Sequence, residues 1–467
     1  MATASSPHFV LFPFMSQGHT IPLLYLARFL RQRLVNLTIF STPANSPEIR
    51  TPLPDTDISI INLPFPKDIA GLPPGVENTD KLPSLSSFLE FANATKFIQP
   101  HFEEALEKLQ HVSCIISDSF LPWTEESAAK LCIPRLVFNG INNFSMTMYY
   151  IIAQEQPNAQ VCSDDETFLI QNFPNLNLTV NDIEPPVCEL GSKSALIDFV
   201  AKQAIAMSKG RGLIVNSFYE LEQSFNDYWN QKFGPRAWCV GPLCLGKPKK
   251  SQTLQKPTWV EWLDEKLAMQ QAVLYVAFGT QADISLEQLH EIALGLEQSK
   301  VSFMWVPRSR HQDFPDRFEE RVKDRGLIVK EWVDQMEILQ HDSIQGFLSH
   351  CGWNSVLESI CASVPILALP LIAEQHLNAR LVVEVIGVGL RISPSNGSVR
   401  GFVKSEEVEK MVKELMHGEK GAEARKKVEE VGVAASRATE EGGSSWCTLN
   451  QLIEEVCRKD VESPICK

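Results

Sequence analysis

A histidine in the first part of the chain is a candidate for proton-transfer chemistry. His19 follows the apolar run 8–14 and stands just before a helix that we predict to open at Pro22. A helix N-terminus disfavours additional positive charge, so an imidazole there is biased toward the neutral form that a general base requires. A loop histidine that merely caps the helix would occupy the same position.

An aspartate is the matching candidate. Asp118 ends a second apolar run, residues 114–118, and a carboxylate at that depth is costly unless it is paired. If the two runs are strands whose carboxyl ends meet, Asp118 can accept the other ring N–H of His19 and orient the imidazole. An aspartate that caps the following helix is the alternative.

The segment 332–375 contains a group of potential phosphate ligands. It is predicted to form a strand over 345–349, a turn, and a helix from about Asn354 to Ala362. The start of a helix offers backbone N–H groups to an anion. The residues that could bind a phosphate there are His350, Gly352, Asn354 and Ser355.

Four other residues of this segment could bind a base or sugar. Glu358 lies one helical turn after Asn354 and could accept ribose hydroxyls, and Trp332 could stack on a base. Glu374 and Gln375 follow the next strand and could bind sugar hydroxyls. Three of the residues in this segment also have purely structural explanations. Trp332 could be a core aromatic, His350 a core histidine with satisfied hydrogen bonds, and Glu374 a charged residue at a helix start. Their shared position at strand ends favours one site.

The elements that must position these residues alternate between short β-rich runs and helical patterns. This alternation is typical of parallel sheets covered by helices on both faces. Two successive series of runs predict an α/β chain with two doubly wound sheets in tandem. The predicted strands are 8–14, 37–41, 58–63, 114–118, 135–138 and 212–216, then 272–278, 303–306, 327–330, 345–349, 365–368 and 388–392.

A change of composition separates the two series. Residues 241–257 carry lysines and prolines and almost no apolar side chain after Leu245, which predicts a linker. The chain is thereby divided into a first domain of residues 1–240 and a second of residues 258–447, followed by a C-terminal helix in residues 448–467.

Helix boundaries are clearest in the second domain. Ser285 and Gln288 predict a capping box, and a helix over 405–417 is predicted to stop at Gly418. The tail 422–459 predicts one or two further helices interrupted by a pair of glycines.

Composition restricts the possible partners. The 467 residues include 43 basic and 57 acidic side chains, a formal net charge of −14, and such a surface repels nucleic acid and anionic lipid. The eleven cysteines are scattered without a CxxC pair or zinc-binding spacing, and no signal peptide or membrane span is evident. We predict a cytoplasmic protein without a nucleic-acid partner or membrane insertion.

The segment 332–375 resembles the signature box of plant family 1 UDP-dependent glycosyltransferases, WxPQxxxLxHxxxGxFxxHCGWNSxLExxxxGVPxxxWPxxxEQ, and the match stays in register from end to end. Similarity extends to FPFMSQGHTIP, SDSFLPWTEESAAKLCIPRLVF, VNSFYELE, VGPL and LYVAFGT, and therefore to nearly the whole chain.

This resemblance implies a GT-B fold, in which two Rossmann-like domains face each other across a cleft. The second domain would hold a UDP-sugar donor and the first a small hydroxyl-bearing acceptor, with the C-terminal helix 448–467 packing back on the first. UDP-glucose would be a co-substrate, no metal or other cofactor is expected, and the protein is predicted to be a monomer.

The resemblance also implies roles for residues of the nucleotide site. Trp332 would stack on uracil, with the main chain of Val333 and the side chain of Gln335 beside the base or ribose. Glu358 would hold the ribose hydroxyls. The diphosphate would be held by the helix start at Gly352 and by Thr280, His350, Asn354 and Ser355.

At the reacting end, the resemblance implies that Trp353, Glu374 and Gln375 contact the hexose, with glutamine at position 375 favouring glucose over galactose. His19 would be the general base and Asp118 its partner. Four positions depart from the signature and leave the donor sugar open: Asp334 replaces proline, Gln345 and Ser363 replace glycines, and Leu369 replaces tryptophan.

The expected reaction is direct displacement at the anomeric carbon of UDP-glucose, giving a β-glucoside. A catalytically silent binding protein of the same fold is the alternative from another class. An NAD-dependent oxidoreductase is more remote, because SQGHTIP occupies the place of a GxGxxG turn.

The acceptor is expected to be a phenolic or other lipophilic plant metabolite. Apolar and aromatic loops of the first half would line its pocket. The residues expected there are Phe14, Met15, Phe120, Asn142 and Phe144.

Overall fold

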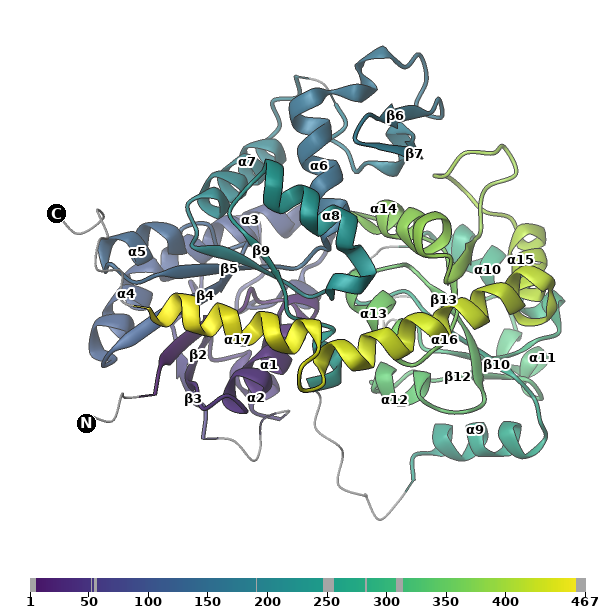
Figure 1. Cartoon of the computed structure of the whole chain (residues 1–467). Coiled ribbons are helices and arrows are strands. Elements are labelled where there is room, and N and C mark those ends of the chain that lie inside the picture. The colour runs from purple at the N-terminus through teal and green to yellow at the C-terminus, as the bar shows by residue number, and fades with distance from the viewer. Residues whose placement is uncertain are drawn as a thin grey trace. The chain divides into compact units, whose positions relative to one another are not determined.

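The computed structural model describes residues 6–51, 53, 57–189, 191–246, 256–281, 284–307 and 314–458. Contacts divide the chain into two compact units (Figure 1). The first comprises Met1–Asn143, Ser192–Lys249 and Arg437–Lys467, and the second comprises Phe144–Gly191 and Lys250–Ser436. The segment Phe144–Gly191, which the sequence analysis assigned to the first domain, thus groups with the second unit. Of the predicted linker, residues 247–255 lie outside the described residues.

The first unit contains a seven-stranded parallel sheet in the order β3-β2-β1-β4-β5-β8-β9. The six strands predicted for the first half are confirmed within one or two residues at each end, and β9 was missed. The strands are β1 (His8–Phe12), β2 (Asn36–Ser41), β3 (Ser59–Asn62), β4 (Val112–Asp118), β5 (Arg135–Asn139), β8 (Gly212–Val215) and β9 (Ala237–Cys239).

Alternate residues of the central strands enter two separate cores. Phe9 and Leu11 of β1 pack in one cluster, whereas Val10 and Phe12 pack in the other. Both faces of the sheet are therefore covered, which is why these strands read as continuous apolar runs. The strand order changes direction between β1 and β4, and the adjacent residues Phe12 and Ser117 bring their carboxyl ends together.

Helix α1 (Gln17–Arg31) begins five residues before the predicted start at Pro22. The prediction was wrong because a proline removes one internal helix hydrogen bond without ending the helix here. Upstream of the proline, the backbone N–H groups of His19 and Thr20 already donate to the carbonyl of Ser16 at 3.1 and 2.8 Å. His19 consequently lies in the first helical turn.

The other helices of the first unit cover its sheet. They are α2 (Ser46–Arg50), α3 (Phe88–Ala94), α4 (Gln99–Lys108), α5 (Thr124–Lys130), α7 (Ala195–Ser208), α8 (Tyr219–Lys232) and α17 (Ser444–Cys457). Helix α17 buries Leu449, Leu452 and Val456 in the cluster that contains Phe9. Of the predicted C-terminal helix, residues 459–467 lie outside the described part of the chain.

The second unit contains a six-stranded parallel sheet in the order β12-β11-β10-β13-β14-β15. The six strands predicted for the second half are confirmed. They are β10 (Val273–Ala277), β11 (Ser302–Trp305), β12 (Gly326–Ile328), β13 (Ile344–Ser349), β14 (Ile366–Ala368) and β15 (Gly389–Arg391). An antiparallel hairpin of β6 (Phe168–Ile170) and β7 (Phe173–Leu178), which the sequence analysis missed, belongs to the same unit.

The helices of the second unit include the two that caps predicted. They are α6 (Asn143–Glu155), α9 (Thr258–Ala268), α10 (Leu286–Ser299), α11 (Phe318–Val322), α12 (Gln335–Leu339), α13 (Trp353–Cys361), α14 (Gln375–Arg380), α15 (Ser405–His417) and α16 (Glu419–Thr439). The hydroxyl of Ser285 accepts the N–H of Gln288, but the amide of Gln288 pairs with the backbone of Val403. The capping box is therefore wrong in its second half. Among the described residues, no helix has the length and apolar character needed to cross a bilayer.

Candidate active site

Strands β1 and β4 bring together the predicted pair of His19 and Asp118. Nδ1 of His19 lies 2.8 Å from Oδ2 of Asp118. The carboxylate is fully buried, whereas 19% of the histidine side chain is exposed. In the neutral tautomer with its proton on Nδ1, the imidazole donates to the carboxylate and presents Nε2 as an acceptor. This is the geometry that a general base requires.

Of the two interpretations left open for Asp118, the structure shows the contact with His19, whereas the capping of the following helix is wrong, because the N-cap of α5 is Trp123. Oδ1 accepts the backbone N–H of Phe120 at 2.9 Å, so one oxygen fixes the turn after β4 while the other contacts the imidazole. His19 does not serve as the helix cap, because the N-cap of α1 is Ser16.

Aromatic rings surround the imidazole. The ring centre of Phe120 lies 4.7 Å from that of His19, and the centre of Phe14 lies 5.6 Å from it. Phe88 and Phe199 then contact Phe120, with ring centres at 5.6 and 6.0 Å. Phe88 and Phe120 are partly exposed, whereas Phe14 and Phe199 are buried behind them. The surface beside His19 is therefore suited to an aromatic ligand.

The five residues expected to line an acceptor pocket have different positions. Phe120 is the partly exposed one, and Met15 is buried in the aromatic core that contains Phe14. Asn142 and Phe144 are also fully buried, and Phe144 groups with the second unit. Phe88 and Phe199 were missed because they come from α3 and α7, where no motif distinguishes them from other core residues.

In the second unit, Gln335 connects several predicted donor residues. Its Nε2 donates to Oε2 of Glu358 at 2.6 Å and to the hydroxyl of Ser355 at 2.9 Å. Its Oε1 accepts from the hydroxyl of Tyr275 at 3.3 Å. Tyr275 on β10 was not predicted, and burial raises its pKa, so it remains a hydrogen-bond donor. The amide of Gln335 thereby fixes the carboxylate of Glu358 at α13.

His350 lies between two glycines at the carboxyl ends of β10 and β13. A Cβ atom on Gly279 would lie 2.5 Å from Nε2 of the imidazole, and one on Gly352 would lie 2.6 Å from it. Gly279 also has a φ of +69°, which a side chain would strain. Only glycine at both positions leaves room for this imidazole. Thr280, the next residue of the turn, is exposed.

The predicted helix after His350 is confirmed as α13, beginning one residue earlier at Trp353. Gly352 is its N-cap and has no side chain with which to cap it. Asn354 is partly exposed at this helix start, whereas the Trp353 ring is almost fully buried.

The loop before α12 carries Trp332, which is 76% exposed and is therefore not the core aromatic of the alternative interpretation. Val333 is partly buried against the core of the second unit. An exposed indole of this kind can stack on a flat ligand.

Helix α14 carries the last two predicted donor residues at its start. Glu374 is the N-cap, and the side-chain Oε1 of Gln375 accepts the backbone N–H groups of Leu371 and Ile372. Asn378, which the sequence analysis missed, donates to the carbonyl of Cys351 at 2.9 Å. The HCGWNS turn and α14 are thus held together by a side-chain to backbone bond.

His376 on α14 gives a prediction about pH. Burial, reinforced by the positive charges of Arg400 and Arg391, lowers the pKa of His376 far below its ordinary value. The unfolded chain binds a proton at this residue below about pH 6.5, and the folded chain does not. Stability from this residue is therefore complete above pH 6.5 and falls as the pH falls, by up to about 1.4 kcal/mol per pH unit.

His376→Gln, which keeps an acceptor for the guanidinium of Arg391, should flatten this dependence. The measurement is the free energy of unfolding between pH 7.5 and 5 for the wild type, for His376→Gln and for the exposed control His101→Gln. Equal slopes in the wild type and His376→Gln would contradict the prediction.

Within the described residues, no group of three or more histidine, cysteine, aspartate or glutamate side chains could hold a metal ion.

Comparison with known proteins identifies the family. The family model described as UDP-glucoronosyl and UDP-glucosyl transferase matches residues 255–424. Over 462 residues the chain is 48% identical to UDP-glycosyltransferase 90A1 of Arabidopsis thaliana, covering 97% of this chain and 96% of the relative. The chain belongs to the plant family 1 UDP-glycosyltransferases. It is also 36% identical to the scopoletin glucosyltransferase of Nicotiana tabacum, over 96% of this chain and 98% of that protein.

Solved structures give the same result for the fold of this UDP-glycosyltransferase. A Glycyrrhiza uralensis enzyme complexed with glycyrrhetinic acid 3-O-monoglucuronide matches with a TM-score of 0.86 at 30% identity, covering 97% of this chain and 96% of that one. A Phytolacca americana enzyme complexed with UDP-2fluoro-glucose and pterostilbene matches with a TM-score of 0.79 at 29% identity, covering 97% and 100%. The fold is GT-B, and the enzyme transfers a sugar from a UDP-sugar to a small plant metabolite.

The structure shows the backbone or side-chain environment of each of the four residues at which this UDP-glycosyltransferase departs from the signature. Ser363 has a φ of +56° after α13, a conformation that glycine adopts more easily. Asp334 is the N-cap of α12, but its side chain accepts no backbone N–H of the helix. Leu369 is buried in the core, and Gln345 donates to the carbonyl of Asp342.

Proposed function

We propose that this enzyme transfers glucose from UDP-glucose to a hydroxyl group of an aromatic or similarly lipophilic plant metabolite, with inversion to a β-glucoside. The observation that carries the proposal is the contact of His19 with buried Asp118 beside the partly exposed rings of Phe88 and Phe120. The tobacco relative named for scopoletin and the Phytolacca structure with pterostilbene, both of which name aromatic hydroxyl compounds, support this acceptor class.

In the proposed reaction, Nε2 of His19 accepts the proton of the acceptor hydroxyl. The acceptor oxygen forms a bond to the anomeric carbon while the bond from that carbon to the diphosphate oxygen breaks on the opposite face. Asp118 keeps the imidazole in the required tautomer and stabilises the imidazolium that forms. The products are the β-glucoside, UDP and a proton that returns to solvent from His19.

The proposed donor contacts use the second unit. Trp332 stacks on uracil beside Val333 and Gln335, and Glu358 accepts the ribose hydroxyls. Hydrogen-bond donors at the start of α13 and in the neighbouring turns stabilise the negative charge that develops on the diphosphate. No metal takes part in any step. The phosphate donors are Thr280, His350, Gly352, Asn354 and Ser355. Trp353, Glu374 and Gln375 are assigned to the hexose.

We also propose that the enzyme acts as a monomer in the cytoplasm. The ten cysteines among the described residues are all free thiols, which supports a reducing compartment.

A panel of acceptors incubated with UDP-glucose tests the proposal. Phenols with two or more fused or conjugated rings are expected to give products heavier by one hexose, with release of one UDP per product, and NMR of the anomeric proton should show the β configuration. Sugar alcohols and amino acids of similar size are the control acceptors. UDP binding without UDP release from any acceptor would instead support a silent binding protein.

A further inference from the structure

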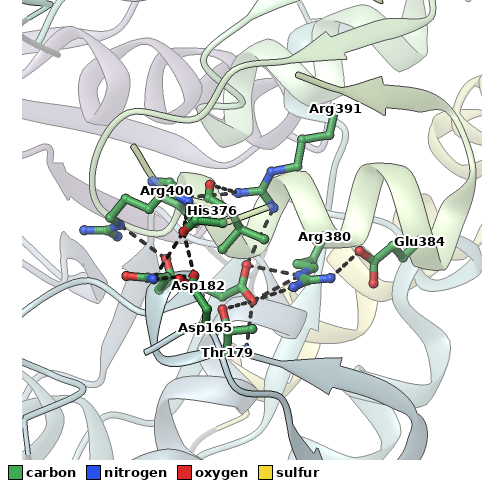
Figure 2. Close-up of polar contacts among 11 residues, drawn as sticks. Asp165, Thr179, Asp182, His376, Arg380, Glu384, Arg391 and Arg400 are labelled. Atoms are coloured by element: carbon green, nitrogen blue, oxygen red, sulfur yellow. Dashed lines mark hydrogen bonds and ion pairs between the residues drawn. The ribbon is translucent and has the colours of Figure 1, made fainter. Parts of the chain in front are cut away.

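A buried ionic cluster in the second unit lies outside every role described so far (Figure 2). Its centre is Asp182, a fully buried carboxylate in the segment Phe144–Gly191. Arg380 donates to both of its oxygens from Nε at 3.0 Å, and Nη1 of Arg391 lies 3.6 Å from Oδ1. The backbone N–H and hydroxyl of Thr179 also donate to Oδ2, at 2.9 and 3.0 Å. We call Asp182, Arg380 and Arg391 the Asp182 cluster.

The two arginines connect Asp182 to one short helix. Arg380 is the last residue of α14 (Gln375–Arg380), and it also pairs with Glu384. Arg391, on β15, donates to Nδ1 of His376 in the same helix at 3.0 Å. Both positive charges that meet Asp182 therefore act on α14 (Figure 2).

The other end of α14 bears the proposed sugar contacts. Glu374 is its N-cap and Gln375 its first residue. A helix of six residues is only about 9 Å long, so a displacement of Arg380 moves Glu374 and Gln375 by a similar amount. Asn378 fixes the same helix to the carbonyl of Cys351 beside the phosphate turn. The hydroxyl of Ser145 donates to Oδ1 of Asn378 as well, so the Asp182 cluster is one of several attachments that set the orientation of α14, and the one at its C-terminal end.

Burial makes the cluster sensitive to the loss of one charge. Asp182 is inaccessible to solvent, and only 12% and 8% of the Arg380 and Arg391 side chains are exposed. A buried guanidinium that loses its carboxylate must be rehydrated or turn toward another partner, and for Arg380 at the end of α14 the other partner is Glu384, so the loss of Asp182 is expected to shift this end of the helix. Figure 2 shows Asp182 in contact with both arginines and Glu384 in contact with Arg380.

We propose that Asp182 is a positioning residue for donor-sugar recognition: by pairing with Arg380 and Arg391 it holds α14 in the orientation that presents Glu374 and Gln375 to the hexose. Asp182 itself does not touch the donor. This inference rests on the proposed function, because it takes Glu374 and Gln375 as the sugar contacts. It assigns a role in sugar selectivity to a residue almost 200 positions before the helix that it controls.

The variant that tests the proposal is Asp182→Asn, with Glu184→Gln as matched control. Glu184 lies two residues away and pairs with Arg400 at 2.9 Å in a partly exposed ion pair; Arg400 places its charge near His376 but makes no hydrogen bond to α14 in the described part of the chain. A displacement of about 1 Å away from the reacting atoms can cost about 100-fold in rate. We expect Asp182→Asn to lower kcat/KM for UDP-glucose by about 10-fold and to reduce the preference for UDP-glucose over UDP-galactose. The affinity for UDP alone should change less than about 2-fold, since none of the proposed nucleotide contacts lies on α14.

A second variant separates positioning from folding. Arg380→Lys keeps the positive charge and loses the bidentate geometry. Arg380→Lys should also lower kcat/KM for UDP-glucose while leaving the affinity for UDP nearly unchanged. Its melting temperature should be close to that of the wild type. If Asp182→Asn does not fold, Arg380→Lys alone decides the question.

Three outcomes would overturn the inference. The first is wild-type sugar preference in the folded variants, the second is an equal loss of UDP and UDP-glucose affinity, and the third is the same selectivity change in Glu184→Gln. Gln375→Ala tests the proposed sugar contact itself. If Gln375→Ala keeps the wild-type sugar preference while Asp182→Asn alters it, the assignment of Gln375 fails and the control of selectivity by Asp182 stands.

Discussion

Replacement of His19 by alanine is expected to lower turnover at least about 100-fold, because the acceptor hydroxyl loses the base that removes its proton. Affinity for UDP should remain at the wild-type value, since His19 lies in the first unit and the proposed nucleotide residues lie in the second. Steady-state kinetics with a phenolic acceptor gives the change in kcat, and calorimetric titration with UDP gives the affinity.

Two further variants sharpen this test. Asp118→Asn keeps the shape of the side chain but removes the charge that selects the Nδ1-protonated tautomer, so we expect a loss of at least about 10-fold in kcat. His101→Ala removes an exposed histidine of α4 in the same unit and should retain full activity. Wild-type turnover in His19→Ala, or equal losses in His19→Ala and His101→Ala, would refute the assignment of the base.

The His19–Asp118 contact could be predicted from sequence because it depends only on where two strands end. Both residues follow strands with unmistakable apolar runs, and a doubly wound sheet places the carboxyl ends of its first and fourth strands together. The predicted start of α1 at Pro22 is wrong because proline is common at the first helical position, whereas Ser16, a residue type preferred at the N-cap, stands at the true start. The prediction placed His19 in a loop rather than in the first turn of α1, and its contact with Asp118 was unaffected by this error.

The residues that sequence reasoning missed are those whose roles come from distant packing. Phe199 reaches the aromatic shell from α7, and Tyr275 contacts Gln335, which lies 60 positions further along the chain. Asp182 ends a short 3-10 helix (Val180–Asp182) and forms a capping box with Thr179, so its local sequence indicates a capping residue and gives no sign of a pair with distant arginines. Only the fold shows that its carboxylate is buried against Arg380. Local periodicity predicts which face a residue occupies, but it carries no information about partners that far along the chain.

The donor side is subject to an equally direct test at Glu358. Replacement of Glu358 by alanine is expected to weaken UDP binding by about 10- to 100-fold, because hydrogen bonds to a charged group contribute about 1.5 to 3 kcal/mol. The loss has two sources, the acceptor of the ribose hydroxyls and the 2.6 Å partner of the Gln335 amide. Glu409→Ala, which removes a glutamate of the surface pair with Lys413 on α15, is the matched control and should bind UDP normally.

A modified ligand distinguishes the two sources of this loss. If Glu358 accepts the ribose hydroxyls, the wild type should bind UDP more tightly than 2′-deoxy-UDP, and Glu358→Ala should bind the two alike, since the carboxylate that discriminates between them is gone. If Glu358 serves only to fix Gln335, both ligands should weaken by the same factor and their ratio should persist. Titration of both nucleotides into both proteins measures the coupling, and an unchanged ratio in Glu358→Ala would exclude the ribose contact even if UDP affinity fell.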